Sequence, residues 1–223
     1  MTRGQDVEID PAASILGLID VQPTFMPGGG LPVPDGDRIV PPINRLMRHF
    51  AHAFATQDWH KPGHLSFASA HPGRSPYETI ELPYGTQILW PDHGIAGTEE
   101  AMIHPDIDQT RIELVVRKGC RIELDSYSAF FENDHTTPTG LDGWLRQRGF
   151  RQLFLCGLAT DFCVAWSAED AARLGYYVTI VEDACRAIAL PTAGGRTTMD
   201  EARDRLTVLG VRFAVSADLV TAR

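Results

Sequence analysis

The feature that most constrains the fold of this chain is an alternation of short apolar runs with amphipathic segments. Six runs have the length and apolar character of strands that are buried on both faces: Ser14 to Ile19, His52 to Thr56, Ile112 to Arg117, Gln152 to Cys156, Tyr177 to Val181 and Phe213 to Ser216. Helical spacing marks four segments between them: Asp37 to Arg48, Gly140 to Arg148, Thr160 to Leu174 and Thr197 to Leu209. This order predicts an α/β fold, a doubly wound domain in which helices cover both faces of a mostly parallel six-stranded sheet.

The length of the chain and one irregular segment bound its organisation. A chain of 223 residues with 43% hydrophobic content can bury one sizeable core, so we expect residues 1–223 to form a single domain. The segment from about 58 to 109 breaks the rhythm, because it is rich in Pro, Gly and His and has no clear strand or long helix. A loop of this length inside a compact domain is usually functional.

Charge and composition exclude two classes of partner. Twenty basic against 29 acidic residues give a net charge of -9, which repels nucleic acid and anionic membrane surfaces. The N-terminal stretch has no apolar core of the signal-peptide type, and no long apolar run follows it. We therefore expect a cytoplasmic protein with no nucleic-acid or membrane partner, in which the four cysteines are free thiols.

Polar side chains follow four neighbouring strands of the predicted sheet. Asp20 follows the first strand, and Asp58 and His60 follow the second. Lys118 follows the third strand, and the turn that contains Cys163 follows the fourth. Each has an ordinary explanation alone, as a turn cap, a solvated strand end or a small buried residue. Because ligands bind at the carboxyl ends of strands in such sheets, their coincidence there predicts a site.

The position of Cys163 favours a nucleophile. A helix that begins near Thr160 would place this thiol in its first turn, where unpaired N–H groups and the helix dipole favour the thiolate. A nearby Lys118 ammonium would lower the thiol pKa further. Backbone N–H groups of Ala159 and Cys163 are candidates for an oxyanion hole, and Asp20 is a candidate general acid and base.

A second group of residues has the chemistry of a metal site. Asp58, His60 and His93 form a mixed oxygen and nitrogen ligand set that suits one divalent ion, such as Zn, Fe(II) or Mn(II). The competing interpretation is that Asp58 and His60 only hydrogen-bond the long loop. Water or further side chains of the same loop could complete the ligand shell: His64, Ser66 and His71.

Five stretches along almost the whole chain carry a specific pattern. They are Ile19-Asp20-Val21-Gln22 with Phe25, Thr56-Gln57-Asp58-Trp59-His60 through Ser66-Phe67-Ala68-Ser69, Trp90-Pro91-Asp92-His93, Lys118-Gly119, and Gly157-Leu158-Ala159-Thr160-Asp161-Phe162-Cys163. Together they resemble the nicotinamidases within the isochorismatase-like cysteine hydrolases. The resemblance implies a Rossmann-like fold and hydrolysis of nicotinamide to nicotinate and ammonia, through a cysteine thioester, in NAD salvage.

The same resemblance implies roles for particular residues. It gives Asp20, Lys118 and Cys163 as the catalytic triad, and Asp58, His60 and His93 as the metal ligands. It also implies a cis peptide between Leu158 and Ala159, and a substrate ring held between two aromatic side chains, Phe25 and Trp90. The fourth protein ligand varies within the family. Ser66 and His64 compete for that position here, and the surrounding Ser-Phe-Ala-Ser run favours Ser66.

Two other functions remain as alternatives. A related cysteine amidase that acts on an N-carbamoyl or pyrazinamide-like amide would keep the triad, and with an N-carbamoyl substrate it would have no need of a metal that orients a pyridine. A non-catalytic, metal-binding member of the fold would have no need of the triad of Asp20, Lys118 and Cys163. Nicotinamide is the expected small-molecule partner, and the pattern leaves open whether the chain forms a homo-oligomer.

Overall fold

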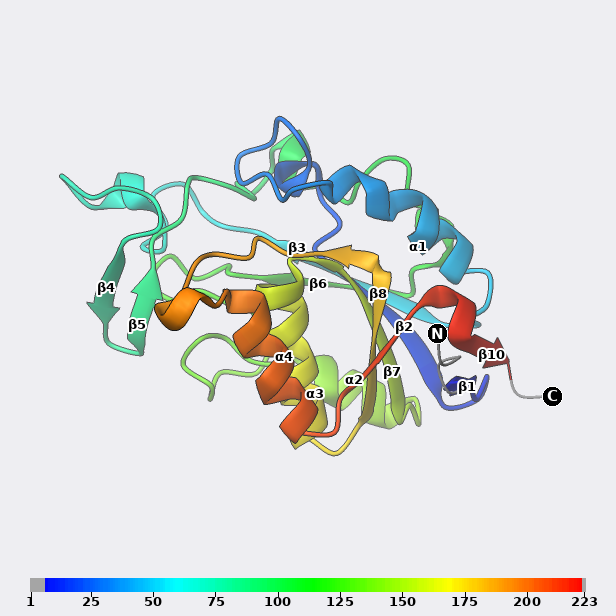
Figure 1. The fold of residues 1–223 in the computed structure, drawn as a ribbon. Helices are drawn as coiled ribbons and strands as arrows, with labels where there is room; N and C mark the ends of the chain where they lie inside the picture. Colours follow the sequence, from blue (N-terminus) through cyan, green and yellow to red (C-terminus); the bar gives the residue numbers. More distant parts are fainter. Residues whose placement is uncertain (1–6, 222–223) are drawn as a thin grey trace.

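The computed structural model describes residues 7–221 and is built around one main sheet (Figure 1). Its six strands lie in the order β6-β3-β2-β7-β8-β9, and every neighbouring pair is parallel. They are β2 (Ser14–Ile19), β3 (Ala53–Asp58), β6 (Leu114–Lys118), β7 (Gln152–Leu158), β8 (Tyr177–Arg186) and β9 (Arg212–Ala214). The predicted six-stranded α/β fold is confirmed.

Helices cover both faces of this sheet. They are α1 (Val40–Leu46), α2 (Leu141–Gln147), α3 (Ala165–Arg173) and α4 (Thr198–Val208). Figure 1 shows α1 on one side of the sheet and α3 with α4 on the other. Thr197 begins α4 with a capping box, in which its side chain and that of Asp200 satisfy each other's backbone N–H groups. Among residues 7–221, no helix combines the length and the apolar character that a bilayer crossing requires.

The order of the strands sets the place where a ligand can bind. The chain proceeds from β2 to β3 and β6 on one side, and from β7 to β8 and β9 on the other. Its direction therefore reverses between β2 and β7, and the carboxyl ends of these neighbours form the crevice where such sheets bind ligands. All residues of β2 and β3 are buried, as expected for strands covered on both faces.

Several element boundaries differ from those expected. β3 and β6 extend further at their carboxyl ends, so that Asp58 and Lys118 are the last residues of their strands and do not follow them. The expected helix 160–174 is divided into a π-helical turn, Thr160–Val164, and α3. The ends of a strand are set by its pairing with neighbouring strands. The local apolar pattern of the sequence carries no information about that pairing.

Two strand pairs were not expected at all. β1 (Val7–Ile9) pairs in parallel with β10 (Leu219–Thr221), and β4 (Thr79–Leu82) forms an antiparallel hairpin with β5 (Gly85–Ile88). The hairpin corrects the expectation that segment 58–109 has no clear strand. β4 alternates between exposed and half-buried residues, so it lacks the apolar signal of a core strand. That residues 1–223 form a single domain stays a prediction.

We predict that Gly157→Ala destabilises the protein strongly. Gly157 in β7 has a φ of 122°, and a Cβ there would lie 2.0 Å from the carbonyl oxygen of Ile19 in the neighbouring strand. Backbone of a central strand cannot move aside, so we expect a loss of more than about 3 kcal/mol in the free energy of unfolding.

Gly143→Ala is the matched control. Gly143 lies in α2, is exposed, and has no atom within 4 Å of the Cβ that alanine would add. Removing a helix-interior glycine should raise stability by about 0.5–1 kcal/mol. Urea unfolding followed by circular dichroism measures both variants, and equal midpoints for Gly157→Ala and the unmodified protein would contradict the prediction.

Candidate active site

Lys118 lies at the centre of the predicted triad. Its side chain is fully buried, and its Nζ lies 2.8 Å from Oδ2 of Asp20 and 3.4 Å from Sγ of Cys163. The same ammonium donates to Oδ1 of Asp58, and to the carbonyl oxygen of Ser126 at 2.9 Å. The structure therefore brings together the three residues that the sequence analysis predicts as a triad, and adds a direct contact between Lys118 and the metal group.

Cys163 lies in the π-helical turn that joins β7 to α3. It is 7% exposed and lines a pocket together with Ala159. The peptide bond between Leu158 and Ala159 is cis, as the resemblance implies. Single π-helical turns of this kind are frequent at functional sites.

The charges of the triad differ from the expected ones. Burial raises the pKa of the Cys163 thiol well above its usual value, and Lys118 offsets this effect only in part. The expected lowering of the Cys163 pKa is therefore wrong for this structure, because desolvation, together with the Asp20 and Asp58 carboxylates, outweighs the Lys118 ammonium. Burial also raises the pKa of Asp20, to about 6, against the lowering effect of Lys118. The resting thiol keeps its proton, and Asp20 is the neighbouring group able to take it.

The carboxylates hold Lys118 charged in return. Burial alone would lower the pKa of Lys118, but Asp20 and Asp58 outweigh it and raise that pKa well above its usual value. Burial alone would raise the pKa of Asp58, but the Lys118 ammonium is the strongest opposing influence, and that pKa lies far below its usual range. A buried ammonium between two carboxyl groups is therefore the dominant electrostatic feature of the site.

The three predicted metal ligands lie together beside the triad. Ligand atoms of Asp58, His60 and His93 lie within 4.8 Å of one another, and all three residues are buried. Nδ1 of His93 must donate to the carbonyl oxygen of Pro91, 2.8 Å away, so its Nε2 carries a lone pair. This Nε2 lies 3.4 Å from Oδ2 of Asp58. Two electron-rich atoms facing each other in a buried place fit a cation between them.

The other candidate ligands lie differently. Oγ of Ser66 and Nδ1 of His64 hydrogen-bond each other at 2.8 Å, and His71 contacts the carbonyl oxygen of Leu65. His64 groups with His60 and Asp125 and not with Asp58 and His93. The choice between His64 and Ser66 as the fourth ligand therefore stays open.

Gly119 makes room for His60. A Cβ at position 119 would lie 2.5 Å from Nε2 of His60, and Gly119 has a φ of 65°. Both observations require glycine directly after Lys118. The two residues of the Lys118-Gly119 pair therefore have separate roles. Lys118 pairs with the carboxylates of Asp20 and Asp58, and Gly119 leaves space for the imidazole of His60.

Aromatic side chains surround the thiol. The pocket at Cys163 is lined by Phe25, Leu31, Asp58, Trp90, His93, Asp125, Tyr127, Ala159, Phe162, Cys163 and Ile188. Phe25 and Trp90, predicted as the ring-binding pair, both take part in this lining. The sequence analysis missed Tyr127 and Phe162, whose rings lie 6.2 Å and 4.9 Å from Trp90. Only their nearness to Lys118 and Cys163 along the chain could have indicated them.

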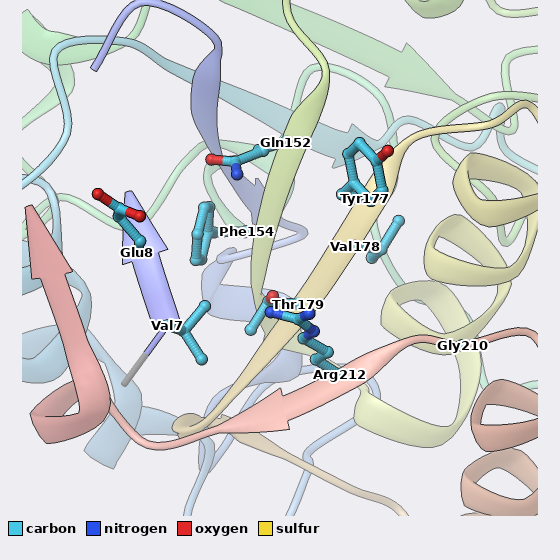
Figure 2. Close-up of a pocket in the computed structure, with 9 residues that line it drawn as sticks. All are labelled: Val7, Glu8, Gln152, Phe154, Tyr177, Val178, Thr179, Gly210 and Arg212. Carbon is cyan, nitrogen blue, oxygen red and sulfur yellow. The ribbon is translucent and has the colours of Figure 1, made fainter. Parts of the chain in front are cut away.

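A second hollow lies at the opposite end of the strands. Figure 2 shows its lining residues: Val7, Glu8, Gln152, Phe154, Tyr177, Val178, Thr179, Gly210 and Arg212. Gln152, Tyr177 and Arg212 are the first residues of β7, β8 and β9. This hollow contains none of the predicted site residues, so the pocket at Cys163 is the candidate active site.

We predict that Lys118→Met lowers stability by about 3–5 kcal/mol, because it leaves the Asp20 and Asp58 carboxylates buried without their cation. Without Lys118, the pKa of both carboxyls rises in the folded state, so both take up protons as the pH falls. The loss of unfolding free energy should therefore be largest at neutral pH and smaller at acid pH. Urea unfolding between pH 5 and pH 8 measures this dependence. Lys61→Met, at an exposed lysine, is the control and should change stability little.

Comparisons with known proteins agree with this geometry. A nicotinamidase from Acinetobacter baylyi is 49% identical over 171 residues, which cover 77% of this chain and 80% of the relative. A nicotinamidase from Escherichia coli is 43% identical over 175 residues, with 77% and 82% covered.

Solved structures are similar over a larger share of the chain. A nicotinamidase/pyrazinamidase from Acinetobacter baumanii has a TM-score of 0.89 at 47% identity, covering 93% of this chain and 98% of the other. PnC1 from L. infantum in complex with nicotinate has a TM-score of 0.82 at 34% identity, with 97% and 100% covered. A pyrazinamidase from Pyrococcus horikoshii in complex with zinc has a TM-score of 0.70 at 28% identity, with 91% and 98% covered.

The family model of the isochorismatase domain matches residues 14–207. This range runs from β2, the first strand of the main sheet, into α4 and includes every predicted site residue, while β9 lies beyond it. The chain therefore belongs to the isochorismatase family.

Proposed function

We propose that this chain is a nicotinamidase, which hydrolyses nicotinamide to nicotinate and ammonia as a step of NAD salvage. The observation that carries the proposal is the position of Cys163. Its thiol lies 3.4 Å from Lys118 at an aromatic pocket whose wall includes Asp58 and His93. The nicotinamidases of Acinetobacter baylyi and Escherichia coli, at 49% and 43% identity, support the same substrate.

The first half of the reaction forms a thioester. As Cys163 Sγ attacks the amide carbon, its proton passes to Asp20, whose ligand atom lies within 4.8 Å of the sulfur. N–H groups of Ala159 and Cys163, which both line the pocket, stabilise the oxyanion. Asp20 then gives its proton to the departing amine, so that ammonia leaves and the acyl group remains on sulfur.

The second half releases the acid. A water molecule gives a proton to Asp20 and attacks the thioester carbon. The carbon–sulfur bond breaks, Cys163 recovers its proton from Asp20, and nicotinic acid leaves and releases its remaining proton to solvent as nicotinate. Throughout both halves Lys118, which pairs with Asp20 and contacts the sulfur, stabilises negative charge on whichever of the two carries it.

Asp58, His60 and His93 would hold one divalent metal ion beside the pocket, with zinc as the choice supported by the pyrazinamidase from Pyrococcus horikoshii. Such an ion would supply a Lewis acid for the pyridine nitrogen and would orient the ring. Phe25 and Trp90, which line the pocket, hold the substrate ring between their side chains and exclude water from it. Fixing the ring in this way presents the carboxamide carbon to Cys163 and makes the attack effectively unimolecular.

We predict that Cys163→Ala abolishes ammonia release from nicotinamide and leaves the circular dichroism spectrum unchanged. The nucleophile is lost, whereas a small buried side chain of similar size remains. Cys120→Ala removes a half-buried thiol that lies outside the pocket lining and should keep full activity. Activity in Cys163→Ala would contradict the assignment of the nucleophile.

A panel of amides in the same ammonia assay separates the alternatives. Hydrolysis of nicotinamide with bound metal supports the proposal, and pyrazinamide tests a second ring amide in the same pocket. Hydrolysis of an N-carbamoyl amide by metal-free protein would favour the related cysteine amidase. Absence of turnover on every amide, together with bound metal, would favour the non-catalytic alternative.

The pH dependence tests Asp20 as the proton acceptor. Burial raises the pKa of Asp20 to about 6. Below that pH the carboxyl is protonated and cannot accept the Cys163 proton, so we expect kcat/KM to fall on the acid side with a limb near pH 6. A profile that stays flat down to pH 5 would exclude Asp20 from this role.

Thr56 offers a matched pair of variants for the same measurement. Its hydroxyl donates to Oδ1 of Asp20 at 2.6 Å and lowers the Asp20 pKa. Thr56→Val removes this donor, so the acid limb should move up by about 1 pH unit. Thr56→Ser keeps the hydroxyl and should leave the limb near its original place.

A further inference from the structure

Asp125 is a buried carboxylate that the proposed reaction does not use. Its side chain is 2% exposed, and its Oδ1 lies 2.9 Å from Nε2 of His60. The backbone N–H of Ser126 donates to the same oxygen at 2.8 Å, and Nε2 of Gln87 donates to Oδ2 at 3.1 Å. Both oxygens of Asp125 therefore accept hydrogen bonds from groups that are themselves fixed.

This contact decides which nitrogen of His60 is free. A carboxylate accepts hydrogen bonds, so Nε2 of His60 must carry the hydrogen that points to Asp125. Nδ1 of His60 is buried and has no hydrogen-bond partner in the described part of the chain. Nδ1 is therefore the His60 nitrogen that remains available to an ion held together with Asp58 and His93. A carboxylate behind an imidazole fixes the ring orientation and raises the basicity of the free nitrogen.

Gln87 connects Asp125 to the wall of the pocket. Nε2 of Gln87 has three acceptors within hydrogen-bond distance, which share its two hydrogens: Oδ2 of Asp125 at 3.1 Å, the hydroxyl oxygen of Tyr127 at 2.9 Å and the carbonyl oxygen of Ile88 at 2.6 Å. That hydroxyl oxygen accepts a second hydrogen bond, from the indole Nε1 of Trp90 at 3.0 Å. One amide of β5 thus holds, through Asp125, the imidazole of His60 and, through Tyr127, the indole of Trp90.

We propose that Asp125 and Gln87 are positioning residues, which fix the ion-binding His60 and the ring-binding Trp90 relative to each other. The inference rests on the proposed function, because it assigns His60 and Trp90 the roles given there. Asp125 acts through His60, and Gln87 acts through Asp125 and Tyr127. One hydrogen-bond network then sets the distance between the ion site at His60 and the indole of Trp90, in place of two loops that move independently.

Asp125 could instead be a ligand itself, since it also groups with His60 and His64. Its hydrogen bonds oppose this interpretation, because Oδ1 already accepts from His60 and Ser126 and Oδ2 from Gln87. These bonds occupy both lone-pair sites of Oδ1 and one of Oδ2, so direct ligation could use only the remaining site on Oδ2. Positioning needs no contact beyond those already present.

Zinc affinity, measured by competition with a chromophoric chelator and without substrate, tests the role of Asp125. We expect Asp125→Ala to weaken zinc binding about 10–100-fold, because the His60 ring loses its orientation. Asp125→Asn keeps an acceptor oxygen for His60 and should recover most of the affinity. Zinc affinity of Asp125→Ala within twofold of the unmodified protein, with a native circular dichroism spectrum, would overturn the proposal.

The absorption spectrum of the cobalt-substituted protein distinguishes positioning from direct ligation. If Asp125 only positions His60, the d–d bands of Asp125→Ala at saturating Co²⁺ should keep their shape and intensity. Loss of a ligand would change the coordination number and hence these bands. A changed spectrum would therefore assign Asp125 to the ion and contradict the positioning role.

Gln87→Met tests the proposed hydrogen-bond network even if Asp125→Ala fails to fold. Methionine has a similar shape but donates to neither Asp125 nor Tyr127, so we expect weaker zinc binding and a several-fold higher KM for nicotinamide. Thr86→Val is the control, since Thr86 lies on the same strand, is exposed, and donates its hydroxyl to Oε1 of Glu81 at 2.6 Å. It should change neither quantity. Identical zinc affinity in Gln87→Met and Thr86→Val would contradict the proposed hydrogen-bond network.

The failure of the inference is distinguishable from that of the proposed function. Zinc affinity and cobalt spectra need no substrate, so they test Asp125 even if nicotinamide is not hydrolysed. Full activity on nicotinamide with unchanged metal binding in Asp125→Ala and Gln87→Met would refute the inference alone.

Discussion

The buried ammonium of Lys118 is the interaction on which the site depends. Asp20 and Asp58 stand at the carboxyl ends of neighbouring strands, where two carboxylates without a cation would repel each other in a medium of low polarity. Lys118 makes their proximity possible and at the same time contacts the sulfur of Cys163. Its charge therefore serves both the stability of this edge of the sheet and the chemistry that we propose there.

The same burial explains why the thiol rests in its protonated form. Withdrawal from water penalises a thiolate more than one ammonium at 3.4 Å can offset, so the pKa of Cys163 is raised. Asp20, also buried and with its pKa raised to about 6, is matched to accept a proton near neutral pH. The position of Cys163 near a helix start had predicted a thiolate that exists before substrate binds. The structure instead favours a protonated thiol next to Asp20, which can accept its proton.

The sequence predicted the sheet and the residues at its strand ends because both depend on local signals. Continuous apolar runs identified all six strands of the main sheet, and polar residues near their ends identified Asp20, Lys118 and Cys163. The metal group depended more on resemblance. The β4–β5 hairpin and the contacts of Asp125 and Gln87 were not predictable, because they arise from packing between segments whose local pattern is weak.

The two halves of the site come from different parts of the chain. Asp20, Lys118 and Cys163 belong to the main sheet and the turns after its strands, whereas His60, His93 and Trp90 come from the segment between β3 and β6. Side chains of this segment can therefore change without moving the proposed nucleophile, its proton acceptor or the ammonium between them. Asp58 connects the two groups of residues, since its carboxylate pairs with Lys118 and also faces His93.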